Sequence, residues 1–147
     1  MSNTSVQTSH FLLVEDDADD ALLTKRAFEK AHIWNRIDVV SSGTDAWDYL
    51  KQKGPYTDTN RYPKPFCVLL DLNMPGMDGR ELIAQMNADD GLRDIPIVVI
   101  STSDYEKDMD LVRKMGAKHY IIKPLKTQSV LQIVAALPNV SVVLGRV

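Results

Sequence analysis

Four short apolar runs in this sequence end in side chains that are able to do chemistry. The runs span residues 11–14, 66–70, 95–100 and 119–122. The side chains that follow them are Glu15 and Asp16, Asp71, Ser101 and Lys123. Apolar runs of this length are typical of strands that are buried on both faces of a parallel sheet. Because the carboxyl ends of parallel strands meet at one edge, we expect these side chains to converge there.

Three carboxylates held close together repel one another, so either protons or a metal ion must relieve the repulsion in the predicted cluster of Glu15, Asp16 and Asp71. Each pair at about 4 Å costs on the order of 4 kcal/mol at an effective dielectric constant near ~20. Oxygen ligands with open positions suit Mg²⁺, which keeps several waters and also takes phosphate oxygens. One Mg²⁺ and the Lys123 ammonium would balance the three negative charges. Asn73, two residues after Asp71, is placed to offer its backbone carbonyl to the metal.

Asp71 is the acid that these patterns indicate as a nucleophile. A carboxylate that attacks phosphorus forms an acyl phosphate. Phosphoryl transfer requires alignment of the reactants and positive charge on the equatorial oxygens. Mg²⁺, the Lys123 ammonium and the Ser101 hydroxyl could each hold one such oxygen. The sequence offers no obvious acid or base for a further step, so we expect the reaction to stop at a phosphorylated Asp71, without turnover of a separate substrate.

Helical patterns alternate with the apolar runs along the whole chain. A weaker strand is predicted over 37–40, which gives five strands. Alternation of this kind predicts a five-stranded parallel sheet with helices on both faces, an α/β doubly wound fold. The runs 11–14, 66–70 and 95–100 are the most apolar and belong in the centre, with 37–40 and 119–122 at the edges. The helices are predicted from 19 to 31, from Ser42 or Thr44 to Gly54, from 78 to 89, from Ser103 to Gly116 and from 128 to 137.

Several of these helices carry specific expectations. The first should bury Leu23, Ala27 and Ala31 along one stripe. Ser103 and Glu106 have the spacing of a capping box for the fourth helix, which should carry Tyr105 on its apolar side with Met109 and Val112; Asp78 and Glu81 have the same spacing for the third. Asp17, Asp19 and Asp20 are expected to be turn or cap residues. The segment 54–65 contains three prolines and is predicted to be a long loop.

Four separated motifs resemble those of the receiver domain of bacterial two-component response regulators. They are Val14-Glu15-Asp16-Asp17, Leu70-Asp71-Leu72-Asn73-Met74-Pro75-Gly76-Met77-Asp78-Gly79, Ile100-Ser101-Thr102 and Lys123-Pro124. Their order and spacing also match the family over residues 10–137. The resemblance implies the CheY-like, flavodoxin-type sheet with strand order 2-1-3-4-5.

The same resemblance implies roles for individual residues. A sensor histidine kinase or a histidine phosphotransfer protein would pass a phosphoryl group to Asp71. Asp16, Asp71 and the Asn73 carbonyl would bind Mg²⁺ directly, with Glu15 acting through water. Ser101 and Lys123 would contact the phosphoryl group, and Tyr120 would swing inward as Ser101 moves. The bond before Pro124 is usually cis in this family.

Two departures from the family pattern point to a subgroup. Thr102 stands where the family has a smaller residue, which would crowd the Ser101–Tyr120 switch. The segment 54–65 is longer than in minimal receivers. With only 24 residues after Lys123, too few for a second domain, these features resemble the stand-alone regulators that pair with phytochrome-type kinases.

Three other functions compete with a phosphorylation switch. A phosphate-shuttle or sink module in a phosphorelay would use the same residues. A haloacid-dehalogenase-type phosphatase also uses a strand-end aspartate, but it needs a second acid where this chain has Asn73. A flavin or nucleotide binder would want a glycine- or threonine-rich loop after the first strand. Glu15-Asp16-Asp17 would repel phosphate there.

Composition limits the partners and the location. The 147 residues carry a formal net charge of −3, which argues against direct nucleic-acid binding. No apolar stretch could span a membrane, and no secretion signal is evident, so a cytoplasmic location is expected. Residues 1–9 are predicted to be a disordered tail, and 138–147 a tail without a structural prediction. A downstream protein, or a second copy of the chain, is expected to contact the face around residues 105–125.

Overall fold

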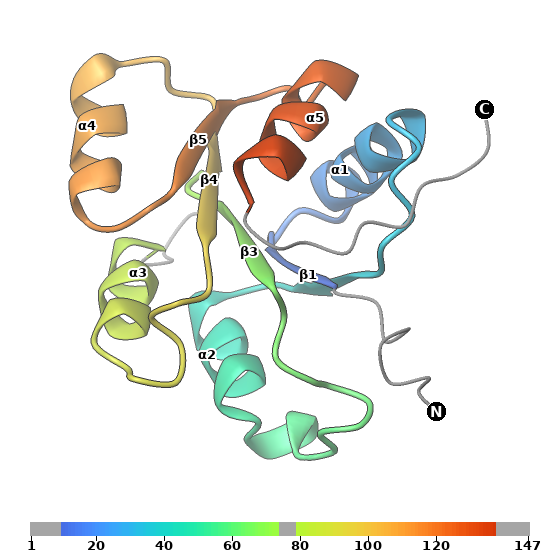
Figure 1. Ribbon diagram of the computed structural model, residues 1–147, viewed down its shortest axis with the longest axis vertical. Helices are drawn as coiled ribbons and strands as arrows, with labels where there is room; N and C mark the ends of the chain where they lie inside the picture. Colours follow the sequence, from blue (N-terminus) through green and yellow to red (C-terminus); the bar gives the residue numbers. More distant parts are fainter. Residues whose placement is uncertain (1–9, 74–78, 138–147) are drawn as a thin grey trace.

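Five parallel strands form a single sheet at the centre of the molecule (Figure 1). The computed structural model describes residues 10–73 and 79–137. The strand order is β2-β1-β3-β4-β5, and all four neighbouring pairs are parallel. This confirms the predicted fold and the predicted central and edge strands. The strands are β1 (Phe11–Val14), β2 (Ile37–Val40), β3 (Cys67–Asp71), β4 (Ile97–Ser101) and β5 (His119–Ile122).

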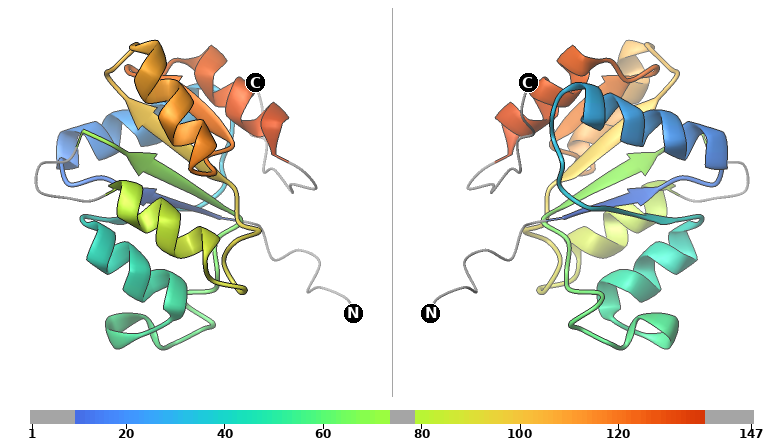
Figure 2. Two further views of the ribbon diagram at one scale, coloured as in Figure 1. Left: turned by 90° about the vertical axis from the view of Figure 1, so that its left-hand side faces the viewer. Right: turned by 90° about the vertical axis from the view of Figure 1, so that its right-hand side faces the viewer.

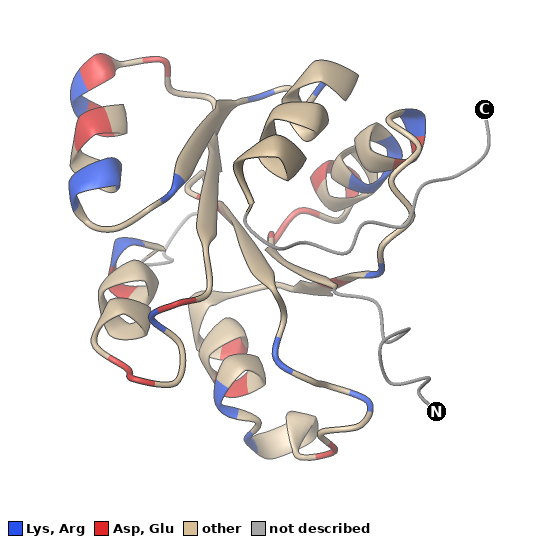
Figure 3. Cartoon of the chain, viewed as in Figure 1, with Lys and Arg blue, Asp and Glu red and all other residues tan. Residues whose placement is uncertain are grey.

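Helices cover both faces of this sheet (Figure 2). They are α1 (Ala18–Lys30), α2 (Gly43–Lys51), α3 (Gly79–Asn87), α4 (Glu106–Lys114) and α5 (Thr127–Ala136). Helices α1 and α5 pack together on one face, while α2, α3 and α4 cover the other. In Figure 3, α4 begins with acidic and ends with basic residues, an order that favours its dipole. Within the described ranges, no helix is long and apolar enough to cross a bilayer.

Alternation along the central strands explains why two separate cores form. In β1, Leu12 and Val14 face the α2–α3–α4 side, and Phe11 and Leu13 face the α1–α5 side. Every residue of β1, β3 and β4 is buried. In a strand that is covered on both faces, a polar side chain would be buried without water, so the first polar residue stands at the end of the strand. This constraint delivers the acids and hydroxyls to one edge of the sheet.

Two of the helix predictions were wrong in detail. Leu23 is 59% exposed, whereas Ala27 and Ala31 are buried as predicted. Helix α1 also buries Thr24 and Phe28, so its buried face passes through Thr24 rather than Leu23.

The capping box predicted for α4 is absent. The helix begins at Glu106 with Tyr105 as its N-cap, and Tyr105 is 57% exposed rather than on the apolar side. The Ser103 hydroxyl bonds instead to the Asp108 carboxylate at 2.8 Å and accepts from the Tyr105 backbone N–H at 3.2 Å. The Asp78–Glu81 cap lies outside the described residues.

The long loop after α2 is anchored by an aromatic cluster. Tyr56 and Tyr62 each pack against the ring of Tyr49, at centroid distances of 5.1 and 5.7 Å. The buried Tyr49 hydroxyl donates to Asp38 at 2.5 Å and bonds to the His10 ring at 2.9 Å. Tyr49 belongs to the core on the α2–α3–α4 side of the sheet, so Tyr56 and Tyr62 fasten the loop to that core.

The backbone conformation between α4 and β5 requires a glycine at position 116, and substitution there tests this requirement. The φ of +119° at Gly116 and the Asn87 side chain, which would clash with an added Cβ, both disfavour a side chain. We expect Gly116→Ala to lower the free energy of unfolding by about 3 kcal/mol, since it adds strain and displaces the Asn87–Met115 hydrogen bond. Gly54, with φ of +58° and open space around it, is the matched control: Gly54→Ala should cost only about 1–2 kcal/mol. Equal losses in urea unfolding would contradict this explanation.

Candidate functional site

Three carboxyl groups meet at the carboxyl edge of the sheet. Glu15 follows β1 directly, Asp16 is the next residue, and Asp71 ends β3. Their oxygens lie within 4.8 Å of one another. Glu15 and Asp71 are buried and Asp16 is exposed, so the cluster opens to solvent on one side. The structure therefore brings together the three acids that the sequence predicted to converge.

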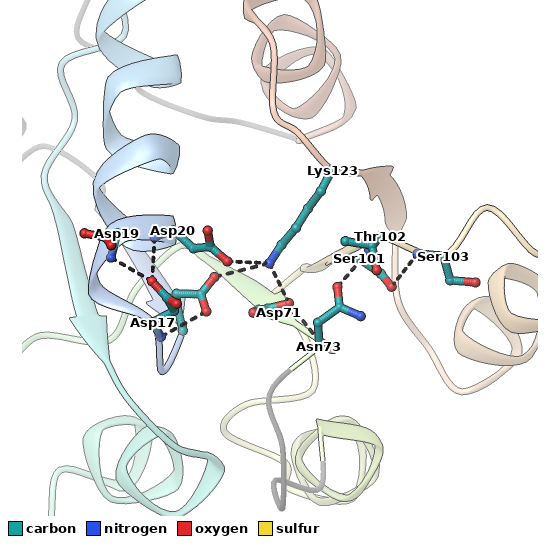
Figure 4. A network of polar contacts seen from close by, with 10 residues as sticks. Asp17, Asp19, Asp20, Asp71, Asn73, Ser101, Thr102, Ser103 and Lys123 are labelled. Atoms are coloured by element: carbon teal, nitrogen blue, oxygen red, sulfur yellow. Dashed lines mark hydrogen bonds and ion pairs between the residues drawn. The ribbon is translucent and has the colours of Figure 1, made fainter.

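Lys123 supplies the positive charge of this cluster, and Figure 4 shows its ammonium among the acids. Its Nζ lies 3.1 Å from Asp71 Oδ1 and 3.5 Å from Glu15 Oε1. It also lies 3.4 Å from Asp20 Oδ2. The residue stands just after β5, and its bond to Pro124 is cis, as the family resemblance implied.

Burial and charge change the acidity of this cluster in the metal-free protein. The pKa of Glu15 is raised to about 8, first by burial and then by its hydrogen bond to Asp71. Burial alone would lower the pKa of Lys123, but the hydrogen bond and charge of Asp71, with Glu15 and Asp20, outweigh it and raise that pKa. The two shifts favour a proton on Glu15 and a charged Lys123.

The turn between β1 and α1 is held by Asp17. Its carboxylate accepts the backbone N–H groups of Asp19 at 2.8 Å and Asp20 at 3.0 Å, which makes it the N-cap of α1. Its own N–H donates to Glu15 Oε2 at 3.2 Å. The predicted cap role of Asp17 is confirmed. In Figure 3, this turn and the first turn of α1 are acidic, as the helix dipole favours.

Polar residues after β3 and β4 close the other side of the site. The Asn73 N–H donates to Asp71 Oδ1 at 2.8 Å, and the Asn73 side-chain oxygen accepts the Thr102 N–H at 2.7 Å. Ser101 is buried, and its hydroxyl accepts the Ser103 N–H at 3.1 Å. These bonds tie the ends of β3 and β4 together beside Asp71, the phosphoacceptor that the sequence predicts.

Tyr120 on β5 points inward in this structure. It is 5% exposed, and its hydroxyl donates to the Ser103 carbonyl at 2.9 Å. Thr102 is exposed, and its backbone N–H is held by Asn73. The predicted switch residues Ser101, Thr102 and Tyr120 thus lie on two neighbouring strand ends, β4 and β5, which pair directly.

The sequence prediction missed Asp20 as a partner of Lys123. It assigned Asp20 only to the start of a helix. No local pattern indicated this pair, because the contact depends on the start of α1 lying beside the residue that follows β5. A groove of about 720 Å³ runs beside Asp20 and Lys123 and is also lined by Asn73, Thr102 and Arg26.

Comparison with known proteins identifies relatives with this arrangement. The family model "Response regulator receiver domain" matches residues 11–135. The response regulator Rcp1 from Synechocystis sp. is 31% identical over 139 residues, which is 95% of this chain and 92% of Rcp1. The structure of its Mn²⁺-bound form has a TM-score of 0.71 at 29% identity and covers 91% of this chain and 98% of that chain.

Two further solved structures agree with this assignment. The bacteriophytochrome response regulator RtBRR has a TM-score of 0.82 at 32% identity, over 95% of this chain and 84% of that chain. The phosphorylated cyanobacterial phytochrome response regulator RcpA has a TM-score of 0.71 at 35% identity, over 86% of this chain and 89% of that chain. These matches do not support the phosphatase or phosphate-shuttle alternatives. The chain belongs to the response regulator receiver-domain family and functions as a response regulator of two-component signalling.

Proposed function

We propose that Asp71 is the residue that accepts the phosphoryl group. The donor would be a phosphorylated histidine of a sensor histidine kinase or histidine phosphotransfer protein. An Asp71 carboxylate oxygen attacks phosphorus, the bond from phosphorus to the histidine nitrogen breaks, and an acyl phosphate forms. The observation that carries this proposal is the position of Asp71, with two acids on one side and Lys123 Nζ at 3.1 Å on the other.

We propose that Mg²⁺ is the metal of this site. The donor set is all oxygen and opens to solvent through Asp16, which suits a hard cation that keeps waters and takes phosphate oxygens. Burial and the neighbouring Asp71 raise the pKa of Glu15, and a cation bound beside these carboxylates would favour their ionised forms. Asp16, Asp71 and the Asn73 carbonyl would hold the metal directly, and Glu15 through water. When bound, the ion would neutralise charge on the phosphoryl oxygens. The Mn²⁺-bound form of the relative Rcp1 supports a divalent ion.

Lys123 and Ser101 would contact the phosphoryl group from the protein side. The Lys123 ammonium already touches the carboxylate that would carry the group, so little movement is needed for it to reach a phosphoryl oxygen. The Ser101 hydroxyl would donate its own proton to another oxygen, because in its bond with the Ser103 N–H it acts only as the acceptor. Preorganised donors of this kind stabilise charge without costly rearrangement.

The proposed signal is a change around α4 and β5 that follows the movement of Ser101. Ser103 links the two ends of this path, because its N–H bonds to Ser101 and its carbonyl accepts from Tyr120. Phosphorylation would bias an existing equilibrium of these contacts. The face around residues 105–125, with exposed Tyr105, Leu111 and Ile122, would then bind a downstream protein or a second copy of the chain.

The proposed kinase is of the phytochrome type, and the proposed location is the cytoplasm. RtBRR and RcpA are named as phytochrome response regulators, and they cover most of this chain. The protein itself would carry out only its own phosphorylation and dephosphorylation. Asn73 supports this limit, because it stands where a haloacid-dehalogenase-type phosphatase needs a second acid.

Labelling with a small acyl phosphate tests the acceptor residue. Wild-type protein incubated with acetyl phosphate and Mg²⁺ should gain a phosphoryl group, and Asp71→Asn should lose at least about 99% of that labelling, since the amide is no longer a nucleophile. Asp90→Asn, at an aspartate that is 93% exposed, should label like the wild type. Separation on a phosphate-affinity gel measures the yield. Labelling that survives in Asp71→Asn would contradict the assignment.

Metal binding should depend on pH in a direction set by Glu15. Because its pKa is about 8 without metal, binding must displace a proton at lower pH. The apparent Kd for Mg²⁺ should fall as the pH rises from 6 to 8 and level off above 8, by up to about tenfold per unit. Calorimetry measures this dependence.

Glu15→Gln should flatten this pH profile, while Asp19→Asn should keep it, because the Asp19 carboxylate is outside the cluster. Asp16→Asn should weaken binding at every pH. A Kd that is independent of pH in the wild type would contradict the role of the Glu15 proton.

A further inference from the structure

Asp20 forms an additional anionic contact with Lys123 beyond the acids that form the proposed metal site. Its Oδ2 lies 3.4 Å from Lys123 Nζ, at nearly the same distance as Glu15 Oε1. The Asp20 side chain is 45% exposed, whereas that of Asp71 is 3% exposed. Figure 4 shows Asp20 reaching the ammonium from α1 and Asp71 reaching it from the sheet. The ammonium is thus shared between the proposed acceptor and a residue outside the metal cluster.

The position of Asp20 is fixed by the start of α1. Its backbone N–H donates to the Asp17 N-cap at 3.0 Å, which holds the first turn. Asp19 lies in the same turn and is bonded to the same cap at 2.8 Å. Only Asp20 of these two has its carboxylate paired with Lys123. The turn therefore fixes the backbone of Asp20 at a point from which its carboxylate reaches Lys123.

Asp20 also changes the charge balance of the site. Glu15, Asp16 and Asp71 would be balanced by Mg²⁺ and Lys123 when all three are ionised. Asp20 adds one further negative charge next to Lys123, at the groove of about 720 Å³ that borders the site. A phosphodonor that enters beside Lys123 brings its own negative charge. Asp20 therefore competes with the donor's phosphoryl oxygens for the same ammonium.

We propose that Asp20 is a positioning residue that restrains Lys123 and so weakens the binding of anionic phosphodonors at Asp71. This inference rests on the proposed function of Asp71. In the unphosphorylated protein, Asp20 holds the ammonium partly toward α1. When a phosphoryl group arrives, Lys123 must give up part of this contact to bind the new oxygens. Removal of the Asp20 charge should make the whole ammonium available to the donor.

Three variants separate this role from a structural one. Asp20→Asn removes the charge, and Asp20→Glu keeps the charge on a longer side chain. Asp19→Asn removes one charge from the same helical turn and is the control. Phosphorylation by acetyl phosphate is measured at saturating Mg²⁺, so that metal affinity does not enter. Asp20→Asn should raise kcat/KM by about twofold to fivefold, the range for a partly exposed ion pair. The change should lie in KM, because the donor's charge meets Lys123 in both the ground state and the transition state.

Salt gives a second readout, which a loss of helix stability would not produce. The gain in Asp20→Asn should shrink as ionic strength rises, since a partly exposed charge is screened. Asp20→Glu and Asp19→Asn should each stay within about twofold of the wild type at all salt concentrations.

The outcomes distinguish failure of the proposed role of Asp20 from failure of the proposed role of Asp71. If wild-type Asp71 labels and Asp20→Asn has the same KM as Asp19→Asn, the positioning role of Asp20 is contradicted and the acceptor role stands. If Asp20→Glu behaves like Asp20→Asn, the charge is not what matters, and the inference is also contradicted. If wild-type Asp71 does not label at all, the proposed function fails and the inference fails with it.

Discussion

Repulsion among carboxylates at one edge of the sheet is the constraint on which the rest of this structure depends. Glu15, Asp16 and Asp71 place their oxygens within 4.8 Å of one another, and two of these residues are buried. Two features relieve this repulsion: burial and Asp71 raise the pKa of Glu15 to about 8, which favours a proton there, and the Lys123 ammonium lies 3.1 Å from Asp71. Under the proposed function, a divalent cation replaces this proton, and phosphoryl oxygens take over part of the lysine contacts.

The free energy gained by burying the two apolar cores offsets this repulsion between the carboxylates. The central strands β1, β3 and β4 are covered on both faces, and their apolar residues form two continuous cores. Burial of this kind contributes roughly 25 cal/mol per Å² of apolar surface, enough to hold charged residues at the strand ends where isolated peptides would separate them. The short loops after the strands then fix the orientation of each group, through the Asp17 cap on one side and the Asn73–Thr102 bond on the other.

Much of this arrangement was predictable because it follows from topology. Apolar runs that end in polar residues gave the strands, and parallel pairing brought Asp71, Ser101 and Lys123 to one edge. Features that depend on distances between elements were not predictable in the same way. Leu23 has the spacing of a buried residue, yet it is exposed while the next residue, Thr24, is buried, because the rotation of α1 against the sheet decides which residues are covered. Ser103 has capping-box spacing, yet its hydroxyl bonds to Asp108. The contact of Asp20 with Lys123 requires α1 and the end of β5 to be adjacent, which no local pattern shows.

The measurement that tests the central proposal most directly is chemical mapping of the acyl phosphate on the wild-type protein. After incubation with acetyl phosphate and Mg²⁺, borohydride reduction converts a phosphorylated aspartate into homoserine, and peptide mass spectrometry locates it. The proposed mechanism predicts homoserine at position 71, and only when both donor and divalent metal are present. Homoserine at another acidic residue, or at position 71 in metal-free samples to the same extent, would contradict it.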